Sequence, residues 1–382
     1  MRLFFEAIYC MKCIVAILLV FLALSIAGCI QQQAPSPTPV PTTTAFPTAE
    51  PTVSAPTATI IPPSPTPEAS PAVNMPRGRT DADFEVPVYD ESKAQYGTTL
   101  FPDNHVAGKP RIVEVNMLGE ILWEYALPPE FAPYTNPGFD VEPLSNGNVL
   151  FVLARKGVYE INRNGAVEWK YENPKVSHDA DRLPNGNTLI DFGNNDAKSD
   201  VQAREIDANG NTVWSWQASS AFDKPPYAAV SIEGWTHANA VLRMDNGDTL
   251  VSLRNFNLTA EIAPDGTLVR TITNTEFDHQ HDPVLLENGN ILLANHGAHQ
   301  GALELTLEGE IVWRFDVLDR EAGPLRDANK LPNGNVLIIG SDRIIEVTPG
   351  KEIVWMLRLK TELDKQSAPA LGFYKAERLA AE

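Results

Sequence analysis

The sequence has few cysteines, and none where the chain could fold into a large domain. Cys10, Cys13 and Cys29 all lie within the first 29 of 382 residues, so the remainder can hold no disulfide, cysteine zinc site or cysteine nucleophile. Basic residues are also scarce: 30 Lys and Arg against 49 Asp and Glu give a net charge of −19. Nucleic-acid binding requires neutralisation of phosphates, so DNA and RNA are not expected partners.

Large apolar residues are rare between Pro35 and Pro76, where 13 of the 31 prolines fall. The rest of this stretch is mostly Thr, Ser and Ala, a composition that cannot build a core. We therefore assign residues 29–82 to a Pro/Thr/Ser-rich linker. Residues 83–382 are long enough to bury one large core and form the predicted folded domain.

The first 28 residues have the pattern of an export signal. Lys12 precedes an apolar run from Ile14 to Ile26, which is followed by Ala27, Gly28 and Cys29. This pattern resembles a lipoprotein signal, which implies cleavage before Cys29 and a lipid on its thiol. The domain is then expected to be anchored to the outer, extracytoplasmic face of the cell membrane. The alternative is an uncleaved signal anchor, which places the domain on the same side.

A Gly followed four residues later by Trp recurs through the folded domain. Two altered copies complete the set, with Arg270 in place of Trp and Lys351 in place of Gly. The six marks, 42 to 56 residues apart, are Gly119/Trp123, Gly165/Trp169, Gly210/Trp214, Gly266/Arg270, Gly309/Trp313 and Lys351/Trp355. A repeat of this length is typical of propellers and solenoids. Because the tryptophans keep one offset from a turn, we expect them to pack between repeats and not to bind a cofactor.

A second signal, Asn-Gly-Asn or Asn-Gly-Asp, begins at residues 146, 185, 246, 288 and 333 and precedes a short apolar run each time. Asn-Gly supplies positive φ, so we expect a two-residue hairpin turn. Each repeat then contains four antiparallel strands in about 45 residues, which is a propeller blade. The sequence thus predicts an all-β fold, a six-bladed β-propeller.

The first repeat lacks an innermost strand, whereas the C-terminus has one to spare. The segment Tyr374 to Leu379 resembles His178 to Leu183 of another repeat. We therefore expect a C-terminal strand to close blade one, which would remove two exposed sheet edges.

The position seven residues before each Asn-Gly signal lies on the innermost strand, near the axis of the ring. Packing alone would favour Val, Ile or Leu there. The occupants are instead Phe139, His178, Asn239, His281, Arg326 and, by comparison of the tail, Tyr374. His237 and His279 lie two residues before Asn239 and His281, and side chains two apart on a strand share a face. Together with Arg254, these residues predict a local cationic site for sulfate, phosphate or carboxylate.

Other interpretations of these polar residues are open. A polar group on an inner strand can simply bond to the next blade or to channel water. Asp179, Asp282 and Asp327 share one offset, and blade-to-blade hydrogen bonds explain them without catalysis. His279 and His281, with His296 and His299 nearby, could bind zinc or copper, although no carboxylate is spaced to complete such a site.

Several local patterns are similar to one known family. Trp235-Thr236-His237-Ala238-Asn239-Ala240-Val241 resembles a Trp-x-His-x-Asn-Ser-Ile motif, and Ser252-Leu253-Arg254-Asn255 resembles a Ser-Ser-Arg segment. Gln280-His281 followed by Asn295-His296-Gly297 resembles a Gln-His and Asp-Asn-Gly pair, and His178-Asp179 before Leu183-Pro184-Asn185-Gly186 is similar to an earlier histidine. These motifs, in this order, are those of the bacterial arylsulfotransferases, which move a sulfuryl group between phenols without a nucleotide donor. The resemblance is strongest over residues 178–297.

The resemblance implies a set of roles. His281 would be the nucleophile that forms a sulfohistidine, and His237, Arg254 and His178 would hold the sulfuryl oxygens. An aryl sulfate would be the donor and a phenol the acceptor, with Asn239, His279, His296, Arg326 and Tyr374 lining the substrate site. No cofactor or metal is implied. A histidine nucleophile divides one difficult transfer into two easier ones, and an arginine offers forked donors to the sulfuryl oxygens.

The chain also departs from this family. His296 replaces an Asn, the Pro-rich linker stands in place of the family's N-terminal β-domain, and the family's cysteine pair is missing. A non-catalytic cell-surface propeller that binds an anionic ligand or a partner protein is the alternative function. Pyrroloquinoline quinone binding is less expected, because quinoprotein propellers usually have eight blades and a vicinal cysteine pair.

Overall fold

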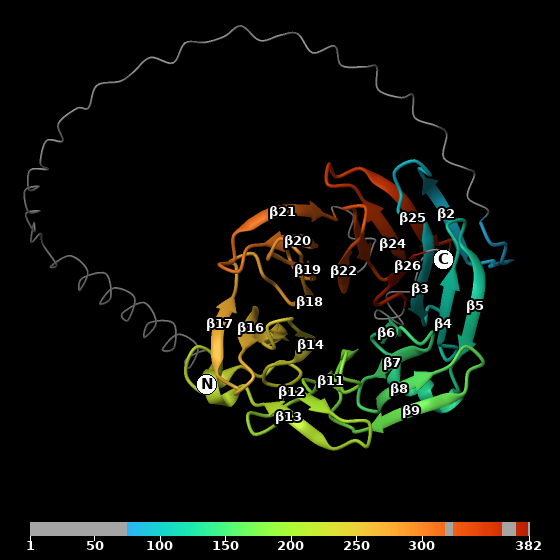
Figure 1. The fold of residues 1–382 in the computed structure, drawn as a ribbon. Helices are drawn as coiled ribbons and strands as arrows, with labels where there is room; N and C mark the ends of the chain where they lie inside the picture. The colour runs from blue at the N-terminus through green and yellow to red at the C-terminus, as the bar shows by residue number, and fades with distance from the viewer. Residues whose placement is uncertain (1–74, 318–323, 361–371, 381–382) are drawn as a thin grey trace, which may run out of the picture. The chain divides into compact units, whose positions relative to one another are not determined.

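The computed structural model describes residues 75–317, 324–360 and 372–380. The signal segment, Cys29 and most of the predicted linker lie outside these residues. The described chain forms six antiparallel sheets arranged radially around one axis (Figure 1), which confirms the predicted six-bladed propeller. Within the described residues, no helix has both the length and the apolar character needed to cross a bilayer.

Blades two to five are four-stranded sheets whose strands follow chain order from the axis outwards (Figure 1). Blade two contains β6 (Asp140–Pro143), β7 (Val149–Leu153), β8 (Gly157–Ile161) and β9 (Val167–Glu172). Blade three contains β10 (Ala180–Arg182), β11 (Thr188–Asp191), β12 (Ala203–Ile206) and β13 (Thr212–Trp216). Blade four contains β14 (Ala238–Arg243), β15 (Thr249–Leu253), β16 (Leu258–Ile262) and β17 (Leu268–Ile272). Blade five contains β18 (Gln280–Leu285), β19 (Ile291–Asn295), β20 (Gly301–Leu305) and β21 (Ile311–Asp316).

Blades one and six each have a fifth strand. Blade six contains β22 (Asp327–Lys330), β23 (Val336–Ile339), β24 (Arg343–Val347), β25 (Ile353–Leu359) and the added β2 (Phe84–Tyr89). Blade one contains β3 (Gly97–Asp103), β4 (Arg111–Val115), β5 (Glu120–Ala126), the added β1 (Arg79–Thr80) and β26 (Glu377–Ala380). The described helices are short loop segments: η1 (Pro129–Tyr134), α2 (Ser219–Phe222), η2 (Tyr227–Ala229) and η3 (Arg254–Phe256).

The C-terminal strand closes the ring as predicted. β26 pairs antiparallel with β3, with Glu377 opposite Leu100 and Ala380 opposite Gly97, and so becomes the innermost strand of blade one. The N-terminal strands were not predicted. β1 pairs with the outer strand of blade one and β2 with the outer strand of blade six, so residues 79–89 join these blades at the rim. Residues 79–82, which we assigned to the linker, therefore include a paired strand of blade one.

The repeated tryptophans pack between blades and also bond across them. Each indole Nε1–H donates to a backbone carbonyl in the outer turn of the next blade, as in Trp123 to Arg163 at 2.8 Å and Trp355 to Met117 at 2.9 Å. The same bond joins Trp169 to Ala208, Trp214 to Pro264 and Trp313 to Pro349. Blade four has Arg270 in place of Trp, and there the Asn274 Nδ2 amide donates to the Gly309 carbonyl at 2.8 Å.

The Asn-Gly turns differ from our expectation of two-residue loops. In blade two, Leu144 N donates to Asn148 O and Gly147 N donates to Leu144 O, which makes a three-residue loop with Gly147 at φ +84°. This is the turn-plus-bulge hairpin in which only the glycine adopts the left-handed conformation. The two asparagines have a second role, because Asn146 and Asn148 both donate to the carboxylate of Glu160 on β8.

Candidate active site

The polar residues predicted to line the axis gather where the innermost strands begin. Asn239 and His281 lie within β14 and β18, Arg326 directly precedes β22, and His178 and Tyr374 lie just before β10 and β26. All of these except Arg326 are buried. Because the inner strands all start at the same end of the ring, five blades contribute to one cluster at one end of the axis.

The backbone at two of the histidines is not that of a regular strand. We expected His237 to share a face with Asn239, and His279 with His281, by simple alternation. Instead His237 and His279 adopt left-handed conformations, with φ of +47° and +58°, so the alternation does not extend to them. The turn at residue 279 points its carbonyl at the following imidazole, and His281 Nδ1 lies 2.8 Å from His279 O.

This contact sets the chemistry of His281. A carbonyl only accepts, so Nδ1 carries the proton and Nε2 carries the lone pair. Nε2 lies 3.1 Å from Nη1 of Arg326, a group that only donates. The His281 ring is 2% exposed and its centroid lies 5.5 Å from that of His296. His281 is therefore a neutral imidazole with its lone pair directed toward a guanidinium.

The other side of the cluster is a chain of rings. His237 and His178 stack with centroids 5.4 Å apart, and His178 lies 5.9 Å from Tyr374. The Arg326 guanidinium carbon lies 5.5 Å from the centroid of the Tyr374 ring, which connects this chain to His281. His237 Nδ1 contacts Glu233 O at 3.1 Å, so its lone pair is also on Nε2.

Arg254 is in η3, immediately after β15. Its Nη1 lies 3.4 Å from Glu233 Oε2, and its charge lowers the pKa of both His237 and His281. Asn239, the neighbouring polar residue of blade four, donates from Nδ2 to Gln280 O at 3.0 Å. The structure thus brings the predicted His178, His237, Arg254 and His281 into one electrostatic environment.

Burial is the largest cause of low pKa values in this cluster. It lowers the pKa of His237 to about 4, with Arg254 as the next cause, and that of His296 to about 2, with Arg326 next. The pKa values of His178 and His281 also lie well below the ordinary value, because burial and neighbouring positive charge both oppose protonation. At neutral pH the histidines are therefore neutral, and the positive charge resides on Arg254 and Arg326.

Several buried polar atoms of the cluster have no hydrogen-bond partner among the described residues. They are His178 Nδ1, Asn239 Oδ1, Arg254 Nε, His296 Nδ1 and the Tyr374 hydroxyl. A buried polar group without a partner costs free energy, and native structures have few of them. Their concentration around two arginines indicates a binding site for a polar, anionic ligand.

A second layer lies one residue further along each inner strand. Lys375 Nζ is 2.5 Å from Asp179, 3.2 Å from Asp282 and 3.4 Å from Asp140. Asp179 also accepts from Val241 N at 2.7 Å, and Asp327 accepts from Ala376 N at 3.0 Å. These two bonds are the blade-to-blade contacts we expected, whereas the lysine at the centre of the aspartates was not predicted.

The histidines do not form a metal site in the described part of the chain. His279 is the most exposed of the predicted site residues of blade five, and its Nδ1 pairs with Asp278 at 2.8 Å. The Nδ1 of His281 is engaged by a carbonyl. No group of three or more potential ligands there is arranged to hold a metal ion.

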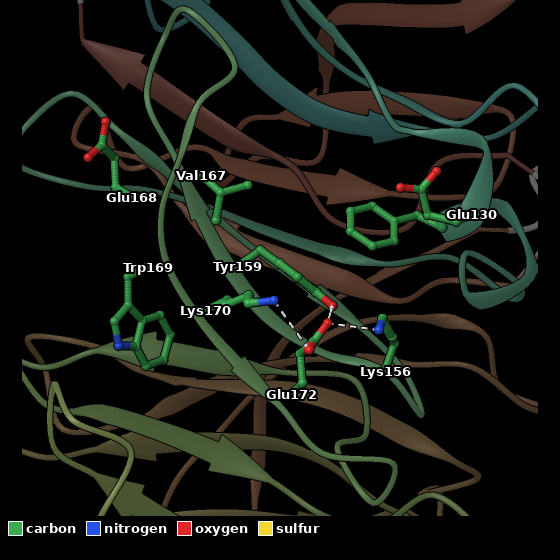
Figure 2. Close-up of a pocket in the computed structure, with 9 residues that line it drawn as sticks. Glu130, Lys156, Tyr159, Val167, Glu168, Trp169, Lys170 and Glu172 are labelled. Atoms are coloured by element: carbon green, nitrogen blue, oxygen red, sulfur yellow. Dashed lines mark hydrogen bonds and ion pairs between the residues drawn. The ribbon is translucent and has the colours of Figure 1, made fainter.

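A separate groove of about 610 Å³ lies on blade two and shares no lining residue with this cluster (Figure 2). Lys156 and Lys170 both approach the Glu172 carboxylate, which also accepts from Tyr159 at 2.8 Å (Figure 2). These contacts lower the pKa of Glu172 to about 2. Since both lysines pair with Glu172, the groove has no cation that lacks a carboxylate partner, as Arg326 does in the axial cluster.

Two kinds of comparison place this geometry among known proteins. The propeller is similar to a crystal structure of a protein of unknown function from Bacteroides caccae, with a TM-score of 0.53 and 22% identity over 74% of this chain and 98% of that one. It is also similar to virginiamycin B lyase from Staphylococcus aureus, with a TM-score of 0.47 and 14% identity over 72% of this chain and 88% of that one. No curated relative matches the chain.

Identities this low show only a shared fold. The sequence match is more specific, because the arylsulfotransferase family model covers residues 85–270, from β2 through β17. This region contains the motifs around His178, His237 and Arg254 that resemble those of the family. Over residues 85–270, the chain therefore matches the arylsulfotransferase family.

Proposed function

We propose that this protein is an arylsulfate sulfotransferase that moves a sulfuryl group from an aryl sulfate to a phenol through a sulfohistidine on His281. The match to the arylsulfotransferase family over residues 85–270 supports a transferase of this general kind. The observation that carries the finer proposal is the state of His281. Its Nδ1 proton is held by the His279 carbonyl, and its Nε2 lone pair lies 3.1 Å from Arg326.

In the first half-reaction, the Nε2 lone pair forms a bond to sulfur as the bond from sulfur to the aryl oxygen breaks. The electron pair leaves on the phenolate, which takes a proton from solvent. Arg326, whose N–H faces Nε2 in the free protein, transfers that hydrogen bond to a sulfuryl oxygen. The charge that develops on the ring is stabilised by the bond from Nδ1 to the His279 carbonyl.

In the second half-reaction, the oxygen of an acceptor phenol attacks sulfur, and the bond from nitrogen to sulfur breaks with its pair returning to Nε2. A base must take the phenol proton. Nε2 of His237 is free to do so, because its Nδ1 donates to the Glu233 carbonyl. The ring of His178 stacks on that of His237 with centroids 5.4 Å apart, so His178 is the second candidate base for this proton.

Mass spectrometry after brief exposure to 4-nitrophenyl sulfate tests this proposal. We expect a gain of one sulfuryl group on the peptide that contains His281, lost on addition of phenol. His281→Asn should abolish both the adduct and the release of nitrophenol, while binding of the unreactive monoanion benzenesulfonate survives. Sulfate binding without an adduct or turnover in the wild type, across a panel of phenols, would support the non-catalytic binding protein instead.

We also propose that the protein is exported and held at the outer face of the membrane by a lipid on Cys29. The support is the signal pattern and the Pro-rich linker of the sequence, which lie outside the described residues. A Cys29→Ser variant should be released into the soluble extracytoplasmic fraction. Release of the wild type into that fraction, or a mature N-terminus other than Cys29, would contradict the lipid anchor.

A further inference from the structure

One carboxylate lies beside the cationic cluster and was not identified from the sequence. Glu233 is in the segment between β13 and β14, and its carboxylate is 3.4 Å from Arg254 Nη1. Its side chain is 70% exposed, whereas that of Arg254 is 13% exposed. Burial and the Arg254 charge lower the pKa of His237, and the Glu233 charge partly opposes this lowering, so its field reaches into the cluster.

The backbone around Glu233 is firmly held even though its side chain faces solvent. Glu233 has φ of +56°, and its carbonyl accepts from both Asn195 N and His237 Nδ1. Asn255 Nδ2 donates to Ile232 O at 2.7 Å and so ties the segment to the residue after Arg254. The Glu233 carboxylate is thus exposed to solvent next to Arg254, while its backbone is held by hydrogen bonds.

The charges of the cluster can then be counted. The histidines are neutral, Arg254 and Arg326 contribute two positive charges, and Glu233 removes one. Lys375, in the layer below, faces three aspartates, so that layer adds no positive charge to the site. The remaining charge of about +1 matches a sulfate monoester, which is a monoanion, and matches poorly the dianions of inorganic sulfate and phosphate.

We propose that Glu233 is a specificity-determining residue, which competes for Arg254 and so selects singly charged sulfate esters over dianions. This inference rests on the proposed function for the identity of the ester, but its physical basis is anion binding alone. A bound anion must share Arg254 with the carboxylate or displace it toward solvent. The Glu233 carboxylate repels a dianion about twice as strongly as a monoanion. Glu233→Gln should remove this repulsion.

Calorimetric titration tests this without catalysis, with inorganic sulfate as the dianion and benzenesulfonate as an unreactive monoanion. In Glu233→Gln we expect the affinity for sulfate to rise by about three- to tenfold more than that for benzenesulfonate, as the loss of one screened unit charge predicts. Glu287→Gln makes the same change in net charge at an exposed site in the Asn-Gly turn of blade five and should leave the ratio unchanged.

Each result separates this inference from the proposed function. An equal change for both anions, or none, in Glu233→Gln overturns it, as does failure of the wild type to bind either anion. If sulfate and benzenesulfonate bind and the ratio shifts as expected but no phenol is released from any aryl sulfate, the specificity role stands and the transferase proposal fails. In an active enzyme, Glu233→Gln should also make inorganic sulfate a stronger competitive inhibitor.

Discussion

Replacement of Arg254 by Met should raise the pKa of His237 by about one unit. The pKa of His237 is about 4 in the folded protein, against 6.5 for a free imidazole, a difference of 2.5. Burial is the larger cause and the Arg254 charge the next, so removing the charge should recover only part of the shift. We therefore expect a pKa of about 5 in Arg254→Met and little change in Arg254→Lys, which keeps the charge.

Histidine NMR gives a direct measurement that needs no turnover. The ring signals of isotopically labelled protein are followed from pH 8 downwards, and His237 is assigned by its loss in His237→Asn. Because His237 is harder to protonate when folded than when unfolded, its contribution to stability is complete above pH 6.5 and is lost between 6.5 and about 4. In Arg254→Met that loss should end near pH 5.

Two outcomes would refute the reasoning. If His237 of the wild type titrates near 6.5, its ring is not in the buried, cationic environment described above. If Arg254→Met keeps its fold but leaves the His237 pKa unchanged, the guanidinium charge does not reach the ring. If His237 is the base that takes the proton of the acceptor phenol, kcat/KM for phenol should fall at low pH as His237 becomes protonated. In Arg254→Met this fall should occur about one pH unit higher than in the wild type.

Three further predictions concern the closing segment. Lys375→Met should destabilise the protein by about 3–5 kcal/mol in chemical denaturation at pH 7, because it leaves buried carboxylates without their cation; adding Asp179→Asn should recover part of this, and no recovery would contradict the pairing. Burial raises the pKa of Glu377 to about 8, so its stabilising effect is lost as pH rises through 8, and Glu377→Gln should melt above the wild type at pH 9 but not at pH 5. Tyr374→Phe removes a hydroxyl with no partner in the described structure, so it should leave the melting temperature nearly unchanged but lower turnover of an aryl sulfate; equal losses in both would indicate a purely structural role.

The repeats predicted the fold well because each signal has one local cause. Gly followed by Trp marks a turn and an interblade bond, and Asn-Gly marks a hairpin, so six blades and the closing strand could be found by counting. The strands at 79–80 and 84–89 escaped detection, because they carry neither signal and pair only with the rims of blades one and six. The prediction of a two-residue turn was also wrong. The asparagine side chains bind a glutamate 12 to 14 residues away, and local turn propensity does not include such a contact.

The candidate site could be predicted where it follows the repeat or where it matches a motif of the family, as Arg254 does. His178, Asn239, His281 and Arg326 share one offset from the Asn-Gly turns, and their convergence follows from the ring. Lys375 and the aspartates each lie one residue after these inner-strand positions, so the repeat also specifies where Lys375 lies. Glu233 lies in an insertion that no repeat covers, and its approach to Arg254 depends on the path of that loop in space.

The strand that closes the ring also delivers Tyr374, which means that the cluster cannot be assembled from any incomplete chain. A polypeptide emerging from the ribosome has made nearly all of its blades before the residue that packs on Arg326 is synthesised. A chain that ended before residue 374 would lack both the closing strand β26 and the tyrosine that packs on Arg326. One short segment, residues 374–380, thus couples closure of the ring to completion of the polar cluster.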